Sequence, residues 1–191
     1  MEVTYFRLYL LGGLILHKAV WEILKRRGTG TAPAPAPPPK ARALSFVKIA
    51  ILTGIAAQTL APAIAPISSQ PDNLRRAGLA LYTLGLTTAI IARLQLGRNW
   101  SDIEKSRVKG DHVLVAHGIY RWVRHPIYTG DLLLLAGLEL ALNSWAVLGV
   151  LPLALYVRQK AAGEERDLAK TLAGYDDYCR RTARFLPFLP S

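Results

Sequence analysis

The sequence predicts an all-α fold, a polytopic membrane bundle of five transmembrane helices, and its composition and hydropathy pattern support this class. Of the 191 residues, 51% are hydrophobic and only 19% are charged, yet the formal net charge is +11. Several apolar runs reach the roughly 20 residues that a bilayer crossing needs, and basic segments separate them. A nucleic-acid binder could carry this charge but would not need such runs, so we expect no nucleic-acid partner.

Three apolar windows in the first half predict the first three helices, at about residues 5–24, 44–67 and 74–96. The second contains Pro62 and Pro66, which are tolerated near the end of a membrane helix. The third is rich in Gly, Ala and Thr, small residues that let membrane helices approach closely. Between the first two windows, the proline-alternating segment 31–40 favours polyproline II and predicts a semi-rigid cytosolic spacer.

The last apolar run, residues 128–157, is too long for one typical span. We therefore predict a helical hairpin that is broken near Asn143, with Trp145 as an anchor at the membrane interface. This hairpin supplies the fourth and fifth spans.

The distribution of basic residues predicts the orientation of the five spans. Strongly basic segments lie at 25–42, at 98–124 and beyond residue 158. The loop between the second and third spans has only Arg75 and Arg76, beside Asp72. An N-terminus outside and a C-terminus inside place every strongly basic segment in the cytoplasm. A four-span count would place one of these segments on the wrong side.

The residues suited to chemistry gather in two predicted cytosolic segments, 97–130 and 158–190. Pro126 disfavours a helical backbone at the residue before it, so His125 is expected at a turn where a membrane helix begins. Such a segment could bind anionic lipid headgroups, or it could form a cytosolic pocket for an anionic or nucleotide-like ligand. The histidine spacing, with no accompanying carboxylate triad, does not indicate a metal site.

Acidic residues raise a separate question. Glu164 and Glu165 follow the last apolar run, where they could be a solvated helix surface or part of a ligand site. Glu139 lies inside an apolar run, where an ionisable group usually faces the bundle interior or a cavity, and Asp131 and His17 pose the same question more weakly. The sequence has no P-loop, no GxSxG elbow and no GxGxxG after a strand.

The order of these motifs resembles the isoprenylcysteine carboxyl methyltransferase family over residues 95–190. The resemblance rests on the combined spacing of these residues: Leu96-Gly97-Arg98-Asn99-Trp100-Ser101, His112-Val113-Leu114-Val115, Gly118-Ile119-Tyr120, Arg124-His125-Pro126-Ile127-Tyr128-Thr129-Gly130, Glu164-Glu165-Arg166-Asp167-Leu168, Gly174, Tyr175, Tyr178, Arg181-Thr182 and Leu186-Pro187.

The resemblance implies an integral membrane methyltransferase that uses S-adenosyl-L-methionine without a Rossmann fold. The cofactor would lie in a cytosolic pocket between the segment before the hairpin and the C-terminal helix. Carried over residue by residue, its contacts would be Lys105, His112, Val113, Leu114, Val115, Tyr120, His125, Pro126, Tyr128 and Glu164. The family tends to place an arginine near the substrate carboxylate one turn before the glutamate. Here Lys160 holds that position and Arg158 lies two residues earlier, so either cation could meet the substrate.

The resemblance also implies a division of the chain and a class of substrate. Residues 1–96 would form three N-terminal membrane helices, and 97–191 the catalytic region. The predicted activity is carboxyl O-methylation of a lipophilic acceptor such as S-prenylcysteine, which enters from the bilayer among the membrane lipids. The alternatives are a phospholipid or other lipid amine N-methyltransferase, a sterol-type reductase with a nicotinamide cofactor, and a lipid-binding membrane protein without activity.

Overall fold

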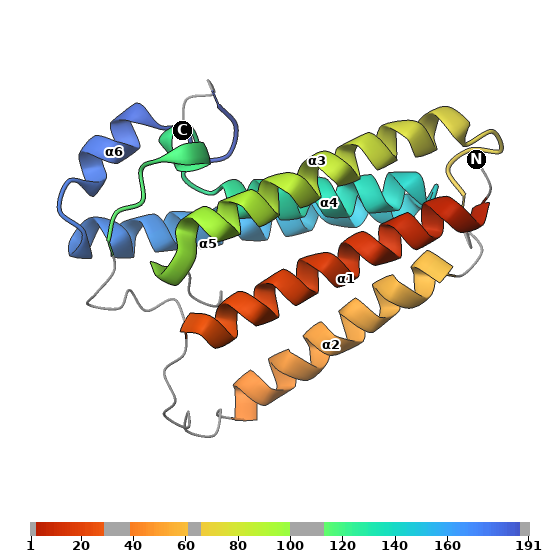
Figure 1. Ribbon diagram of the computed structural model, residues 1–191, viewed down its shortest axis with the longest axis horizontal. Helices are drawn as coiled ribbons and strands as arrows, with labels where there is room; N and C mark the ends of the chain where they lie inside the picture. The colour runs from red at the N-terminus through yellow and green to blue at the C-terminus, as the bar shows by residue number, and fades with distance from the viewer. Residues whose placement is uncertain (1–2, 29–38, 61–65, 100–112, 188–191) are drawn as a thin grey trace.

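The computed structural model describes residues 3–28, 39–60, 66–99 and 113–187, and this part of the chain is helical with no extended strand (Figure 1). The long helices run alternately in opposite directions, while the short α6 lies at the end where α5 finishes. The helices are α1 (Val3–Gly28), α2 (Pro39–Leu60), α3 (Asp72–Leu96), α4 (Pro126–Ala141), α5 (Val150–Thr171) and α6 (Tyr175–Arg181), with the 3-10 turns η1 (Gly97–Asn99), η2 (Gly118–Arg121) and η3 (Trp145–Gly149).

The closest helix pair, α3 and α4, is built on glycine. A Cβ atom at Gly85 would lie 2.3 Å from the backbone nitrogen of Leu134, and one at Gly137 would lie 2.2 Å from that of Tyr82. Gly78 makes the same kind of approach to α4. The small residues of the third apolar window therefore let two backbones touch, as the sequence predicted.

The hydrophobic core lies where α1 packs on this pair. The Tyr82 hydroxyl donates a hydrogen bond of 2.6 Å to the Leu10 carbonyl and so ties α3 to α1. The buried members of this core are Phe6, Leu10, Tyr82, Leu86, Leu134, Leu138, Ala141 and Leu142. Helix α2 lies beside α1 at the edge of the bundle (Figure 1).

The long apolar run leaves the helical conformation at the predicted position. Asn143 has a φ of 58°, in the left-handed region that asparagine tolerates better than most residues. Its side chain accepts a hydrogen bond from the Ser68 N–H at 3.0 Å and donates one to the Ser68 carbonyl at 2.7 Å. Ser144 accepts from the Ala146 N–H and begins η3, where Trp145 is exposed. The break between α4 and α5 is thus held by the segment that precedes α3.

The described part of the second helix, Pro39–Leu60, begins and ends earlier than the predicted range 44–67. It ends at Leu60, so Pro66 lies outside it, in an isolated bridge to Ser144, and Pro62 is not among the described residues. The position of Pro66 outside the helix agrees with the inability of proline to donate a helical hydrogen bond. The spacer at 31–40 also falls almost wholly outside the described residues, since α2 begins at Pro39.

Within the described residues, one helix, α3, is long and apolar enough by composition to cross a bilayer. Helix α4 is strongly apolar but has 16 residues, fewer than a straight span needs. Helix α1 has the length, but it carries ionisable residues such as Arg7 and His17. Glu139 is buried in the bundle as predicted, where it accepts a 2.7 Å hydrogen bond from Gln58. The five-span arrangement remains a prediction.

Candidate functional site

The candidate site lies where α4 begins and α5 passes beside it. Pro126 is the first residue of α4, and His125 has the non-helical backbone (φ −121°, ψ 55°) that a following proline favours. The N–H groups of Arg124 and His125 donate to the carbonyls of Ala183 and Arg184 at 2.9 and 3.0 Å. This backbone pairing brings the C-terminal segment, otherwise about 60 residues away along the chain, against the start of α4.

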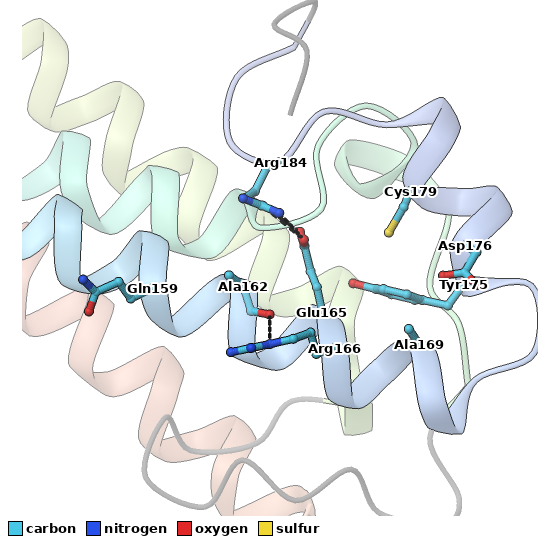
Figure 2. Close-up of a pocket in the computed structure, with 9 residues that line it drawn as sticks. All are labelled: Gln159, Ala162, Glu165, Arg166, Ala169, Tyr175, Asp176, Cys179 and Arg184. Carbon is cyan, nitrogen blue, oxygen red and sulfur yellow. Dashed lines mark hydrogen bonds and ion pairs between the residues drawn. The ribbon is translucent and has the colours of Figure 1, made fainter.

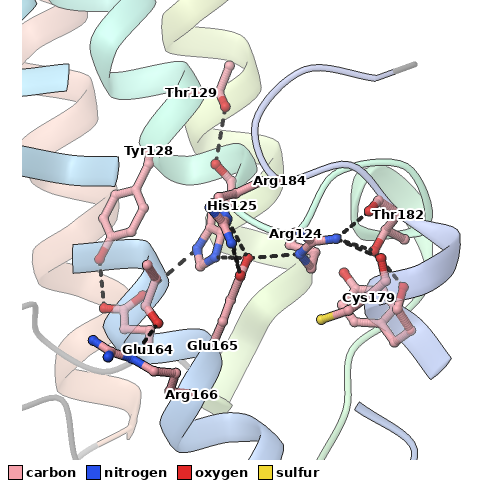
Figure 3. A network of polar contacts seen from close by, with 12 residues as sticks. Arg124, His125, Tyr128, Thr129, Glu164, Glu165, Arg166, Cys179, Thr182 and Arg184 are labelled. Atoms are coloured by element: carbon pink, nitrogen blue, oxygen red, sulfur yellow. Dashed lines mark hydrogen bonds and ion pairs between the residues drawn. The ribbon is translucent and has the colours of Figure 1, made fainter. Parts of the chain in front are cut away.

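Glu165 is the centre of a buried charge cluster (Figure 3). Its carboxylate accepts hydrogen bonds from Arg124 Nε at 2.8 Å, His125 Nε2 at 3.1 Å and Arg184 Nη2 at 2.7 Å. Burial alone would raise the pKa of Glu165, but these donors outweigh burial and hold the pKa well below its usual range. Glu165 therefore stays ionised at neutral pH, and its lowered pKa makes it a weak base.

Arg124 links this cluster to the C-terminal helix. Its side chain is almost fully buried, and Nη1 donates to the carbonyls of Cys179, at 2.9 Å, and Thr182. These carbonyls lie at the end of α6, where a helix leaves carbonyls without partners. The guanidinium thus supplies the missing donors, and Glu165 balances its charge.

Glu164 has a different environment from its neighbour. It accepts a hydrogen bond of 2.7 Å from the Tyr128 hydroxyl through Oε1, while Oε2 lies 3.8 Å from His125 Nδ1, beyond hydrogen-bond length. The rings of His125 and Tyr128 stack at 5.6 Å with 15° between their planes. The Glu164 side chain is 25% exposed against 11% for Glu165. Glu164 can therefore accept a hydroxyl or ammonium group from a ligand.

A pocket of about 590 Å³ opens on the neighbouring face of α5 (Figure 2). Its lining joins α5 to α6 and includes both partners of the Glu165–Arg184 ion pair. The lining residues are Gln159, Ala162, Glu165, Arg166, Ala169, Tyr175, Asp176, Cys179 and Arg184. None of the predicted site residues that the structure describes lines this pocket, because Glu164 and Lys160 lie on a different face of the helix.

Three predicted contacts before α4 form one short stretch without helix. Val113, Leu114 and Val115 follow one another there, and the Val113 N–H donates to Asn99 Oδ1 at 2.9 Å. Tyr120 is buried in η2, where its hydroxyl donates to the Ala92 carbonyl at 3.3 Å. Lys105 and His112 lie outside the described residues.

The two candidate cations differ in their position on α5. Lys160 is half-buried and lies four residues before Glu164, so the two side chains share a helix face. Arg158 is exposed and lies six residues before Glu164, which turns it toward another side.

The sequence did not single out Arg124 or Arg184 as site residues, and it raised Glu165 only together with Glu164. Glu165 contacts Arg124 across 41 positions and Arg184 across 19, so no local spacing revealed the cluster. The available signals were an arginine directly before the His-Pro pair and a second glutamate directly after Glu164.

Comparison with known proteins agrees with the resemblance seen in the sequence. Residues 78–170 match the isoprenylcysteine carboxyl methyltransferase family. A protein-S-isoprenylcysteine O-methyltransferase of Schizosaccharomyces pombe is 30% identical over 115 residues, which cover 59% of this chain and 49% of that protein. A cobalt-zinc-cadmium resistance protein of Cupriavidus metallidurans is 37% identical over 111 residues, covering 57% of this chain and 50% of that protein.

The fold also has a counterpart among solved structures. The eukaryotic intramembrane Ras methyltransferase, an isoprenylcysteine carboxyl methyltransferase, superposes with a TM-score of 0.62 at 23% identity. The superposition covers 97% of this chain and 68% of that chain, so the two chains share an all-helical fold. The chain matches about half the length of these curated relatives. The resemblance to the family is therefore confirmed, over the region that holds His125, Tyr128 and Glu164.

Proposed function

We propose that this chain, which resembles the isoprenylcysteine carboxyl methyltransferases over residues 78–170, is an S-adenosyl-L-methionine-dependent carboxyl O-methyltransferase. Its acceptor is a lipophilic thioether carboxylate such as an S-prenylcysteine. The observation that carries the proposal is the meeting of His125, Tyr128 and Glu164, from two distant motifs, at the start of α4.

The donor set of this cluster fits the proposed cofactor. Within the described residues, Glu164 Oε2 accepts no hydrogen bond and its side chain is partly exposed, so it can take a ribose hydroxyl or an ammonium group. Val113–Val115 offer backbone groups and apolar contact of the kind that suits an adenine ring. When bound, S-adenosyl-L-methionine supplies an electrophilic methyl group on a sulfonium.

The chemistry favours a carboxylate acceptor over an amine. A carboxylate is already ionised at neutral pH, so the protein needs only to orient it and exclude water. An amine acceptor would require removal of a proton. Glu165 is a poor base for that proton because three donors engage its carboxylate and hold its pKa low, and one oxygen of Glu164 already accepts the Tyr128 hydroxyl. We assign the orienting cation to Lys160, which shares the face of Glu164, rather than to Arg158.

The same proposal includes a place in the cell. The ends of α1 and α5 and the start of α2, near which basic residues gather in the sequence, lie at the end of the bundle that holds the candidate site, while residues 66–71 before α3 lie at the other end (Figure 1). With the positive end inside, the protein is a multi-pass membrane protein whose active site faces the cytosol and whose N-terminus lies outside. Large apolar side chains are exposed along the helices, for example Leu16, Phe46 and Leu155, which suits contact with lipid and entry of the acceptor from the bilayer.

Calorimetric titration of S-adenosylhomocysteine into the detergent-purified protein tests the proposal, with a nicotinamide dinucleotide as the parallel ligand. We expect saturable binding of the former alone, weakened at least about tenfold in Glu164→Gln and His125→Ala, since each removes a polar contact. The control is Glu139→Gln, which alters a buried carboxylate at the far end of α4 and leaves binding unchanged. Binding of the nicotinamide alone would move the assignment to a reductase. Binding of neither would leave a lipid-binding protein.

A further inference from the structure

The proposed site leaves one ionisable pair without a role. His17 of α1 lies 2.9 Å from Asp131 of α4, Nε2 to Oδ1, and the Trp21 ring stacks on His17 at 4.0 Å with 20° between the planes. Both members lie within apolar helices, where ionisable groups are costly unless they face each other or a polar space. The stack and the hydrogen bond together hold the imidazole in one orientation.

The hydrogen-bonding capacity of this pair is used only in part. Within the described residues, Asp131 Oδ2 accepts no hydrogen bond, and the Asp131 side chain is 36% exposed. Asp131 lies three residues after Tyr128, on the same side of α4 and about 4.5 Å farther along its axis. An open carboxylate oxygen thus lies one helical turn from the Tyr128–Glu164 pair, on the side away from the basic end.

We infer that the His17–Asp131 pair determines acceptor specificity in the proposed reaction, on which this inference rests. His17 holds Asp131 so that Oδ2 accepts an N–H from the acceptor beside the carboxylate that is methylated. A charge-assisted hydrogen bond of this kind favours an amino-acid-like headgroup. A simple lipid acid also places its carboxylate near that of Asp131, and the two carboxylates repel each other. It has no N–H donor beside its carboxylate to offset this repulsion. The pair therefore selects lipidated amino acids over lipid acids.

Two acceptors that differ in this one group test the inference. They are N-acetyl-S-farnesylcysteine, which has an amide N–H beside the carboxylate, and 3-(farnesylthio)propionate, which has none. With S-adenosyl-L-methionine as donor, we expect the wild type to prefer the first by about tenfold or more in kcat/KM. In Asp131→Ala, kcat/KM should fall at least about tenfold with the first acceptor and less than about threefold with the second. His17→Ala should weaken the preference, and His17→Gln, which can still donate to Asp131, should restore it.

The matched control is Gln58→Leu, which removes another polar contact between helices, at the far end of α4. If Asp131 had a merely structural role, its loss would lower kcat/KM equally for both acceptors. Equal losses of kcat/KM in Asp131→Ala would therefore overturn the inference. A wild type without preference would overturn it as well, even if Asp131→Ala does not fold. Binding of S-adenosylhomocysteine separates the two failures. Methylation without preference removes only this inference, whereas a protein with neither binding nor methylation also loses the proposed function.

Discussion

Two adjacent glutamates at the candidate site have different environments and different expected roles. Glu165 is buried and meets three nitrogen donors, whereas Glu164 meets one hydroxyl and stays partly open. Consecutive residues of a helix point about 100° apart, so a single step along α5 changes the partners completely. We therefore expect Glu165 to support the fold and Glu164 to meet a ligand.

The first test is the stability of Glu165→Gln. A neutral amide leaves Arg124 buried without its counter-charge, and breaking a buried pair in this way typically costs about 3–5 kcal/mol. We expect the thermal unfolding temperature to fall clearly. In the matched variant Glu164→Gln the change should be small, because that carboxylate is more exposed and has no short ion pair. Equal effects in both variants would contradict this division of roles.

The pH dependence of stability has a definite sign. Glu165 binds its proton at a lower pH in the fold than in the unfolded chain, where a glutamate pKa is about 4.3. Its contribution is therefore present above about pH 4.3 and is lost as the pH falls toward the lowered pKa of the folded state. We expect the difference in unfolding temperature between wild type and Glu165→Gln to shrink between about pH 5 and pH 3. A difference that stays constant over that range would be inconsistent with this carboxyl as the source.

At the scale of elements, the glycine-lined contact between α3 and α4 positions the site. Gly130 lies two residues after Tyr128, and a Cβ there would lie 2.6 Å from the backbone nitrogen of Ala89. The two atoms nearest to such a Cβ are backbone atoms of Ala89, so no side-chain rotation can make room for it. The start of α4 is therefore placed by helix packing as well as by the C-terminal segment.

We expect Gly137→Ala to destabilise the protein by about 1–3 kcal/mol, the usual cost of forcing extra volume into a packed contact. Gly54→Ala is the control, since a Cβ at that position of α2 meets nothing within 4 Å. It should be neutral or slightly stabilising because alanine favours helix over glycine. Chemical or thermal unfolding in detergent measures both. A harmless Gly137→Ala would mean that the two helices can separate without loss.

The whole molecule is organised by the alternating direction of its long helices (Figure 1). That alternation collects the ends of α1, α3 and α5 and the candidate site at one end, and residues 66–71 before α3 at the other. The excess of basic residues at one end of the bundle thus predicts the orientation of the whole protein in the membrane.

Cysteine labelling in intact cells tests this orientation. In a Cys179→Ser background, Ser69→Cys lies in the loop between α2 and α3, and Lys170→Cys lies near the end of α5, both at exposed positions. A membrane-impermeant maleimide should label Ser69→Cys from outside and leave Lys170→Cys unlabelled until the cells are opened. Labelling in the reverse order would invert the assignment of the active site to the cytosol.

The sequence by itself determined the helical class, the approximate positions of the first four helices and the break at Asn143, whereas α5 continues to Thr171, beyond the apolar run that ends at residue 157. These features depend on local properties, namely hydropathy over a window and the backbone preferences of Pro and Asn. The resemblance also predicted His125, Tyr128 and Glu164 as site residues through the order of their motifs, and the structure brings these three together. The sequence misjudged the end of α2, because apolar content alone extended the helix to residue 67, past Pro66, which lies outside it.

Only the tertiary structure decided which charges meet. The Glu165 cluster joins residues that are 19 to 41 positions apart, and the His17–Asp131 pair joins residues that are 114 positions apart. Such contacts depend on how helices pack and on where the C-terminal segment crosses α4, and no local pattern encodes either. The tertiary structure therefore separated the glutamate held by cations from the one open to a ligand, although the two are neighbours in the chain.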